Sequence, residues 1–206
     1  MEILLSLSAI VLFFTIYAVI HSFLASLAVK NWLSRVFGAG VERWYRLAYN
    51  FLAVVTLLPL LPMLALLPDQ TLYIVPAPWR WLMAGGQLLA LAGLGITFWQ
   101  TKPWHFLGLA QLLTQQKSDD NGPLVVHGFY RWVRHPLYFF SLLLLWLTPA
   151  MTTNLLVAYI LFTLYFYIGS IYEERRLRTQ FGASYDDYRQ RVPRLIPRPG
   201  RRIAKS

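Results

Sequence analysis

The sequence contains no cysteine, and this absence excludes several kinds of chemistry. Without thiols the chain forms no disulfide, binds no metal through thiolates and has no cysteine nucleophile. Histidine is also scarce, and His21, His105, His127 and His135 lack the spacing of a metal site. We therefore expect no metal ion, with haem ligation through His21 as a minor alternative that stays open.

Charge is scarce as well, whereas apolar runs are long. Charged residues make up 14% of the 206 residues and hydrophobic residues 57%, which is too apolar for a soluble domain of this size. A membrane-crossing helix needs about 20 apolar residues. We predict an all-α, polytopic membrane helical bundle, one domain over residues 1–206, with about five transmembrane helices at 3–29, 47–67, 80–100, 136–152 and 154–172.

Two features of these runs refine the prediction. The N-terminal run lacks the basic, apolar and small-residue regions of a signal peptide, so we expect it to be retained as the first span. The short turn TPAMTTN joins the last two predicted spans, which should therefore form an antiparallel pair.

Basic residues gather on one side of the predicted membrane. Four follow the first predicted span, four follow the third and ten follow the fifth, whereas only Arg80 falls on the other side. The positive-inside rule then places the N-terminus outside and the C-terminus in the cytoplasm. Orientation and contact with anionic lipid headgroups account for the net charge of +10, so nucleic acid is not expected as a partner.

Polar residues crowd the start of the fourth predicted span. Arg134 and His135 come directly before Pro136, which is suited to a first helical position because proline has no N–H to leave unpaired. The unpaired N–H groups and positive dipole of a helix start, with Arg131 and Arg134 beside them, favour a carboxylate or a phosphate.

Glu173 and Glu174 end the fifth predicted span, where the helix dipole and their mutual repulsion disfavour two anions. Two interpretations stay open. The following arginines, Arg175, Arg176 and Arg178, can compensate the charge as a cluster at the membrane boundary. Alternatively, the glutamates hold the ammonium of a ligand whose carboxylate lies at the start of the fourth span.

The motif RHPLY, followed after 34 residues by EE and then by FGASYDDYRQRVPRLIP, resembles the C-terminal signature of a family of membrane methyltransferases. That family includes isoprenylcysteine carboxyl methyltransferase and phosphatidylethanolamine methyltransferase. The likeness covers residues 122–198 and implies that this region binds S-adenosylmethionine. It also implies activity as an S-adenosylmethionine-dependent methyltransferase, acting in the membrane on a small or lipophilic acceptor.

The same resemblance implies roles for individual residues. His135 and Tyr138 would contact the cofactor, Arg134 would anchor its carboxylate or order the loop, and the two glutamates would hold its ammonium or ribose. Capping of the helix by His135 and membrane-interface anchoring by Tyr138 are the structural alternatives. The implied cofactor-binding residues are Gly128, Tyr130, Arg134, His135, Pro136, Tyr138, Glu173 and Glu174.

A methyl transfer needs alignment and desolvation of the reactants more than acid or base catalysis. A thiol acceptor must still lose its proton, and either His135 or a glutamate such as Glu174 could remove it. Arg191 is a further candidate for contact with substrate or cofactor, with a lipid-headgroup contact as its alternative. The candidate catalytic residues are therefore His135, Glu174 and Arg191.

A narrower likeness extends towards the N-terminus. The stretches HSFLASLAVKNW, YRLAYN, FLGLAQ and LTPAMT resemble a bacterial branch that contains methanethiol S-methyltransferases and NnrU-like proteins. The acceptor could be a thiol, an isoprenylcysteine-like carboxylate or a phospholipid amine. The alternative function is that of a non-catalytic NnrU-like accessory or transport protein of respiratory nitrogen metabolism.

The chain departs from this pattern in two places. We expect the chain to lack an extra N-terminal span found in the thiol methyltransferases, which weakens the expectation of a small thiol as acceptor. Phe140 occupies a position after HPxY where the family usually has glycine, so we expect a narrower cofactor pocket.

Three further features carry expectations. His21 lies at membrane depth, where an interhelix hydrogen bond is the expected role and a substrate gate the alternative. Residues 101–127 should form a cytoplasmic connection with a short interfacial helix, which either rests on the membrane or covers the cofactor site. The proline-containing C-terminal segment should pack back under the bundle and end as a disordered basic tail.

Overall fold

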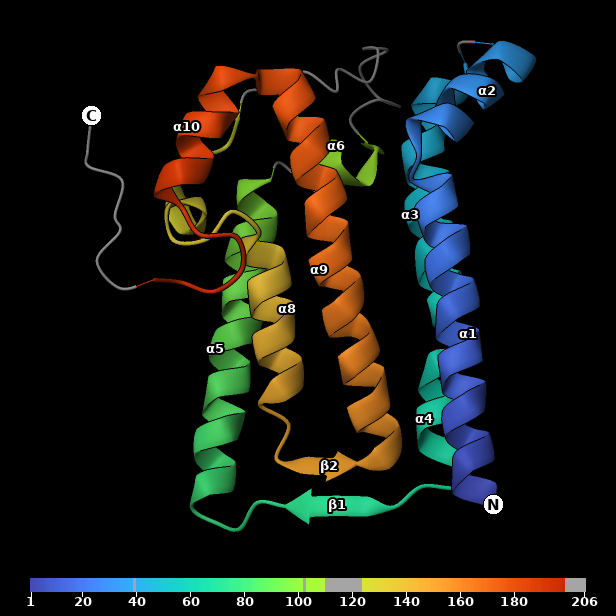
Figure 1. The fold of residues 1–206 in the computed structure, drawn as a ribbon, viewed down its shortest axis with the longest axis vertical. Helices are drawn as coiled ribbons and strands as arrows, with labels where there is room; N and C mark the ends of the chain where they lie inside the picture. The colour runs from blue at the N-terminus through green and yellow to red at the C-terminus, as the bar shows by residue number, and fades with distance from the viewer. Residues whose placement is uncertain (39, 102, 110–123, 199–206) are drawn as a thin grey trace. The chain divides into compact units, whose positions relative to one another are not determined.

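The computed structural model describes residues 1–38, 40–101, 103–109 and 124–198, and most of them are helical (Figure 1). The all-α class is confirmed, apart from one small sheet. The helices are α1 (Glu2–Leu24), α2 (Leu27–Phe37), α3 (Val41–Leu57), α4 (Leu60–Leu66), α5 (Trp79–Gln100), α6 (Pro103–Leu107), η1 (Gly128–Arg131), α8 (Pro136–Trp146), α9 (Thr153–Phe181) and α10 (Ala183–Arg191). The strands are β1 (Thr71–Ile74) and β2 (Ala150–Thr152).

Within the described ranges, four helical stretches are long and apolar enough to cross a membrane: α1, Trp44–Leu66, α5 and α9. Each overlaps a predicted span. The predicted span at 136–152 contains α8, whose 11 residues rise only about 17 Å, short of the roughly 30 Å of a bilayer core. The number of crossings and the orientation of the termini therefore stay predictions.

The first predicted span is wrong at its C-terminal end. It was expected to continue to residue 29, but α1 ends at Leu24 and a new helix, α2, begins at Leu27. The cause is local, since the Ser26 hydroxyl accepts a hydrogen bond from the Val29 N–H at 3.3 Å and caps the new helix.

The short sheet was not predicted from the sequence. Strands β1 and β2 pair with each other, and β2 lies in the turn between α8 and α9. Beside the sheet, Asp69 Oδ1 accepts hydrogen bonds from the Thr153 hydroxyl at 2.7 Å and from the Asn154 N–H at 3.0 Å. The carboxylate satisfies the Asn154 N–H, which the start of α9 would otherwise leave unpaired.

Contacts divide the chain into two compact units, each built from segments that are not consecutive. The prediction of a single domain stays a prediction. The first unit comprises Met1–Tyr73, Lys102–Asp120 and Met151–Leu161, and the second comprises Ile74–Thr101, Asn121–Ala150 and Phe162–Ser206.

In the first unit, α1 packs on α3 and α4 through an apolar stripe that includes Ile10, Phe14 and Tyr17. His21, one turn further along α1, shares a hydrogen bond of 2.7 Å between its Nε2 and the Tyr49 hydroxyl of α3. This confirms the interhelix bond expected for His21. The short helix α6 lies in the expected connection, of which residues 110–123 are outside the described part.

In the second unit, α5 and α8 pack closely along their length (Figure 1). Gly93 of α5 lies directly against the ring of Phe140, and Gly86 lies against Leu147. The Gln87 side-chain amide also donates to the Leu144 carbonyl at 3.1 Å. Small residues at such an interface let two apolar helices approach each other, which is how packing stabilises helices in a membrane.

We predict that Gly93→Ala destabilises the protein by about 1–3 kcal/mol, because the added Cβ would overlap the Phe140 ring and an overpacked interface must shift. Gly95→Ala on the same helix is the matched control, since a Cβ there meets no atom within 4 Å. Thermal unfolding of both variants in one detergent measures the difference. Equal stability of the two variants would show that α5 and α8 are not in close contact.

Candidate active site

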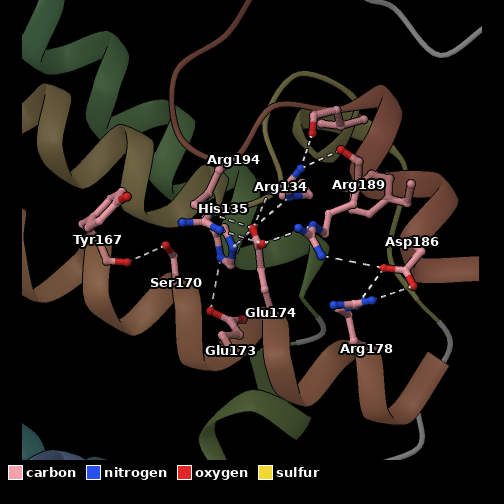
Figure 2. A network of polar contacts seen from close by, with 12 residues as sticks. Arg134, His135, Tyr167, Ser170, Glu173, Glu174, Arg178, Asp186, Arg189 and Arg194 are labelled. Atoms are coloured by element: carbon pink, nitrogen blue, oxygen red, sulfur yellow. Dashed lines mark hydrogen bonds and ion pairs between the residues drawn. The ribbon is translucent and has the colours of Figure 1, made fainter. Parts of the chain in front are cut away.

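The polar residues of the candidate site surround one buried carboxylate, that of Glu174 on α9 (Figure 2). Its side chain is only 5% exposed. It accepts hydrogen bonds from Arg134 Nε at 2.9 Å and from Arg194 Nε and Nη2 at 3.1 Å each, and His135 Nε2 lies 3.3 Å from Oε1. Glu174 is thus held by side chains from two separate segments, the loop before α8 and the segment after α10.

Arg134 connects this carboxylate to the C-terminal segment. Its Nη1 donates to the carbonyls of Arg189 at 2.9 Å and Val192 at 2.6 Å, which belong to the last turn of α10 and the residue after it. A guanidinium is well suited to the unpaired carbonyls at a helix end. The backbones of the two segments are also hydrogen-bonded to each other. The Arg134 N–H donates to the Pro193 carbonyl, and the His135 N–H donates to the Arg194 carbonyl.

The C-terminal segment therefore packs back onto the loop before α8, as expected for this part of the chain. The expected disordered tail, residues 199–206, lies outside the described residues. Tyr185, Tyr188 and Val192 form a buried apolar cluster beside the same loop, and the Tyr188 hydroxyl donates to the Tyr130 carbonyl at 2.7 Å. Burial raises the pKa of Tyr185 and Tyr188, so both phenols remain protonated at neutral pH.

His135 is buried at the start of α8, with Pro136 at the first helical turn as predicted. It occupies the N-cap position of α8, as the capping alternative expected, but its side chain forms no capping hydrogen bond. Both ring nitrogens instead face carboxylates, Nδ1 at 3.2 Å from Glu173 Oε2 and Nε2 at 3.3 Å from Glu174 Oε1. Burial opposes the charged form, but the two hydrogen bonds and the two negative charges together raise the pKa of His135.

Glu173 differs from its neighbour because its side chain is 47% exposed. Its Oε2 accepts a hydrogen bond from the Tyr138 hydroxyl at 3.1 Å. The Tyr138 ring lies almost parallel to His135, with centroids 5.3 Å apart, and almost parallel to Phe166, at 5.0 Å. Glu173 therefore offers an accessible carboxylate at the edge of an aromatic stack.

Two further predicted site residues are Gly128 and Arg191. Gly128 has a φ of +62° at the start of η1, a conformation that favours glycine, and packs on the Gln100 side chain. Arg191 is half exposed and forms an ion pair with Asp187 on its own helix, α10. Within the described part of the chain, Arg191 forms no ion pair with Glu174, so its role stays a prediction.

The compensation expected for the glutamates comes mostly from other arginines. Glu174 is neutralised by Arg134 and Arg194, whereas Arg178 pairs with Asp186 at 2.8 Å. Sequence reasoning did not single out Arg194 or Arg189, although both lie in the matched stretch YRQRVPRLIP. Which arginines pair with Glu174 depends on how the C-terminal segment folds back onto the loop before α8. The local sequence does not specify this path.

Removal of the Glu174 charge should destabilise the fold, because Arg134 and Arg194 would keep a buried positive charge without its partner. We expect Glu174→Gln to lower the free energy of unfolding by about 3–5 kcal/mol. The control is Asp187→Asn, which removes an exposed pair and should cost about 0–1 kcal/mol. Thermal unfolding in detergent compares the two, and a similar small loss in both would contradict a structural role for Glu174.

The raised pKa of His135 predicts a pH dependence of stability. A group whose pKa is higher in the folded protein stabilises it fully below the unfolded value of 6.5, and this stabilisation is lost as pH rises through the folded pKa. The melting temperature should therefore fall as pH rises above about 6.5. His135→Gln should flatten this slope, and an equally steep slope in that variant would assign the effect to another group.

Comparisons with known proteins identify the family of the chain. The family model described as phospholipid methyltransferase matches residues 81–184. Methanethiol S-methyltransferase 2 of Bradyrhizobium diazoefficiens is 32% identical, over 91% of this chain and 71% of its own length. Methanethiol S-methyltransferase of Mycobacterium tuberculosis is 33% identical, over 90% of this chain and 76% of its own length.

A third relative matches a shorter part of the chain. The probable protein-S-isoprenylcysteine O-methyltransferase of Oryza sativa subsp. indica is 40% identical over 84 residues, which are 38% of this chain and 43% of that protein. No solved structure is significantly similar to the chain. The family match and the two long alignments decide the classification: the chain belongs to the phospholipid methyltransferase family and is a membrane methyltransferase.

Proposed function

We propose that the chain transfers the methyl group of S-adenosylmethionine to a thiol, and that the cofactor binds at the start of α8 beside Glu173. The observation that carries this proposal is the contrast between the two adjacent glutamates. Glu174 is buried and paired with arginines, while Glu173 is accessible between His135 and Tyr138. Only an accessible carboxylate can bind a ligand without breaking the network that holds the loop.

The residues present fit the chemistry of this cofactor. Its amino-acid end has an ammonium and its ribose has hydroxyls, and both are donors that the Glu173 carboxylate can accept. The Tyr138 ring is already stacked on His135 and Phe166, so its contribution is the hydroxyl that orients Glu173. For the cofactor carboxylate, Arg189 is more accessible than Arg134, whose side chain is only 8% exposed. Under this proposal Arg134 orders the loop, one of the two roles that the resemblance implied.

When bound, the cofactor supplies a methyl group on a positively charged sulfur, which is reactive towards a thiolate. The protein must align the acceptor with the cofactor, and the thiol must lose its proton. His135 is poorly suited to receive it, because its raised pKa favours the imidazolium form. A carboxylate is a weaker base than imidazole and Glu173 is assigned to the cofactor, so the thiol releases its proton to solvent, and we assign to His135 the task of fixing both glutamates through its two ring nitrogens.

The relatives support a small thiol as the acceptor. Two of them are named for methanethiol and align with most of this chain. The second candidate is an isoprenylcysteine-like carboxylate, which the shorter rice match favours. In either case we place the protein in the bacterial inner membrane, with the basic end of α9 and the cofactor site facing the cytoplasm.

Calorimetric titration of S-adenosylmethionine and S-adenosylhomocysteine into the detergent-purified protein tests the cofactor site. We expect dissociation constants near 1 μM and a loss of about tenfold in Glu173→Gln, which removes one charged hydrogen bond. Tyr138→Phe should also weaken binding, because it removes the hydroxyl that orients Glu173. Arg178→Gln is the control, since it changes an exposed pair with Asp186 outside the proposed site.

The acceptor is then identified with cofactor that carries a labelled methyl group. Methanethiol, a longer alkyl thiol and an isoprenylcysteine analogue are compared at equal concentration, and transfer to the small thiol should be fastest. Fastest transfer to the carboxylate would support the second candidate. A folded protein that binds no cofactor at millimolar concentration would overturn the proposal and favour a non-catalytic NnrU-like role.

A further inference from the structure

The first unit contains a cavity that the proposed function does not use. Its volume is about 560 Å³, and it lies where the end of α1, the amphipathic helix α2 and the first half of α3 meet. This volume falls within the range of about 300–1,000 Å³ that is typical of sites for small molecules. The cavity is therefore large enough for a ligand.

The walls of the cavity are almost entirely apolar. From α3 they include Val41, Tyr45, Ala48 and Leu52, whose spacing of three and four residues forms one stripe along the helix. The polar atoms of the two lining tyrosines are already engaged, since the Tyr45 hydroxyl donates to the Leu24 carbonyl and the Tyr49 hydroxyl is bonded to a histidine of α1. An apolar chain fits such walls, whereas a polar molecule would lose its hydrogen bonds with water.

One side of the cavity is open and is not covered by the helices that form its walls. Phe37 of α2 and Trp44 of α3 line it and are 67% and 61% exposed, respectively. Trp44 also begins the stretch Trp44–Leu66, which is apolar enough to cross a membrane. Tryptophan at the end of such a stretch is typical of the membrane interface. The opening therefore lies where lipid chains meet their headgroups.

A positive charge lies on the cavity side of α2. Leu33 and Phe37 line the cavity, and Lys30 precedes them by three and seven residues, so all three share one face of the helix. A lysine at the membrane interface attracts an anionic lipid headgroup. The apolar walls and this charge together match a molecule with one apolar chain and one anionic head.

We infer that this cavity binds one acyl chain of an anionic membrane phospholipid, with the headgroup phosphate at Lys30. Phosphatidylglycerol has this chemistry and carries no thiol, amine or carboxylate that could accept a methyl group. The lipid is therefore a ligand of the first unit and not a substrate. The inference rests on the cavity and on Lys30, and it is independent of the proposed methyl transfer at α8.

The test is native mass spectrometry of the delipidated full-length protein, titrated with phosphatidylglycerol or with phosphatidylcholine of the same acyl chains. We expect the wild type to retain phosphatidylglycerol preferentially. Ala48→Trp should lose most of this retention, because the indole fills the cavity. Lys30→Gln should reduce the preference for phosphatidylglycerol by about fivefold, the effect of one basic residue near a membrane surface.

Val54→Trp is the matched control, because it adds the same indole to an exposed position of α3 away from the cavity. Ala48→Leu repeats the test with a smaller side chain if the tryptophan variant does not fold, as judged by helical circular dichroism. Equal retention in Ala48→Trp or Ala48→Leu and in Val54→Trp would overturn the site. Equal binding of the two lipids by the wild type would overturn the anionic headgroup. Cofactor affinity, measured in parallel, reports separately on the methyltransferase site.

Discussion

The second unit depends on the neutralisation of one buried carboxylate. A charge without water is destabilising by several kcal/mol unless well-placed partners compensate it. The sequence placed Glu174 at a helix end, but α9 continues to Phe181, so burial and not the helix dipole creates the need for partners. Arg134 binds two kinds of group at once. One edge of its guanidinium binds Glu174, and another nitrogen binds carbonyls at the end of α10. The loop before α8, the end of α9 and the C-terminal segment are thereby joined by a single side chain.

The two adjacent glutamates have different roles in this arrangement. Successive side chains on a helix point about 100° apart, so an adjacent pair can direct one carboxylate inward and the other outward. Glu174 takes the inward position and stabilises the loop. Glu173 takes the outward position, and under the proposed function it receives the ligand. His135 couples the two because it bonds both, so the geometry at the accessible carboxylate depends on the buried one.

Some of this was predictable from the sequence and some was not. The long helices α5 and α9 follow from apolar length alone, and the first turn of α8 follows from Pro136. The break after α1 was missed because a single Ser26 capping bond creates it inside a continuous apolar run. The pairing of Glu174 with Arg194 was missed because Arg175 and Arg178 are nearer along the chain. Only the return of the segment after α10 selects the distant arginine.

Phe140 shows how a departure from a family pattern can be accommodated. Glycine is usual at this position in the families that the motif resembles, and the large ring was expected to narrow the cofactor pocket. In the structure the ring contacts Gly93 of α5 and lies edge-on to Phe129, with centroids 4.8 Å apart. A large residue on α8 thus faces glycine on α5, and the close packing of the two helices is preserved. The contacts of Phe140 therefore support a role in helix packing, and the residues that would set the shape of the cofactor site are Tyr138 and Glu173 on the accessible side.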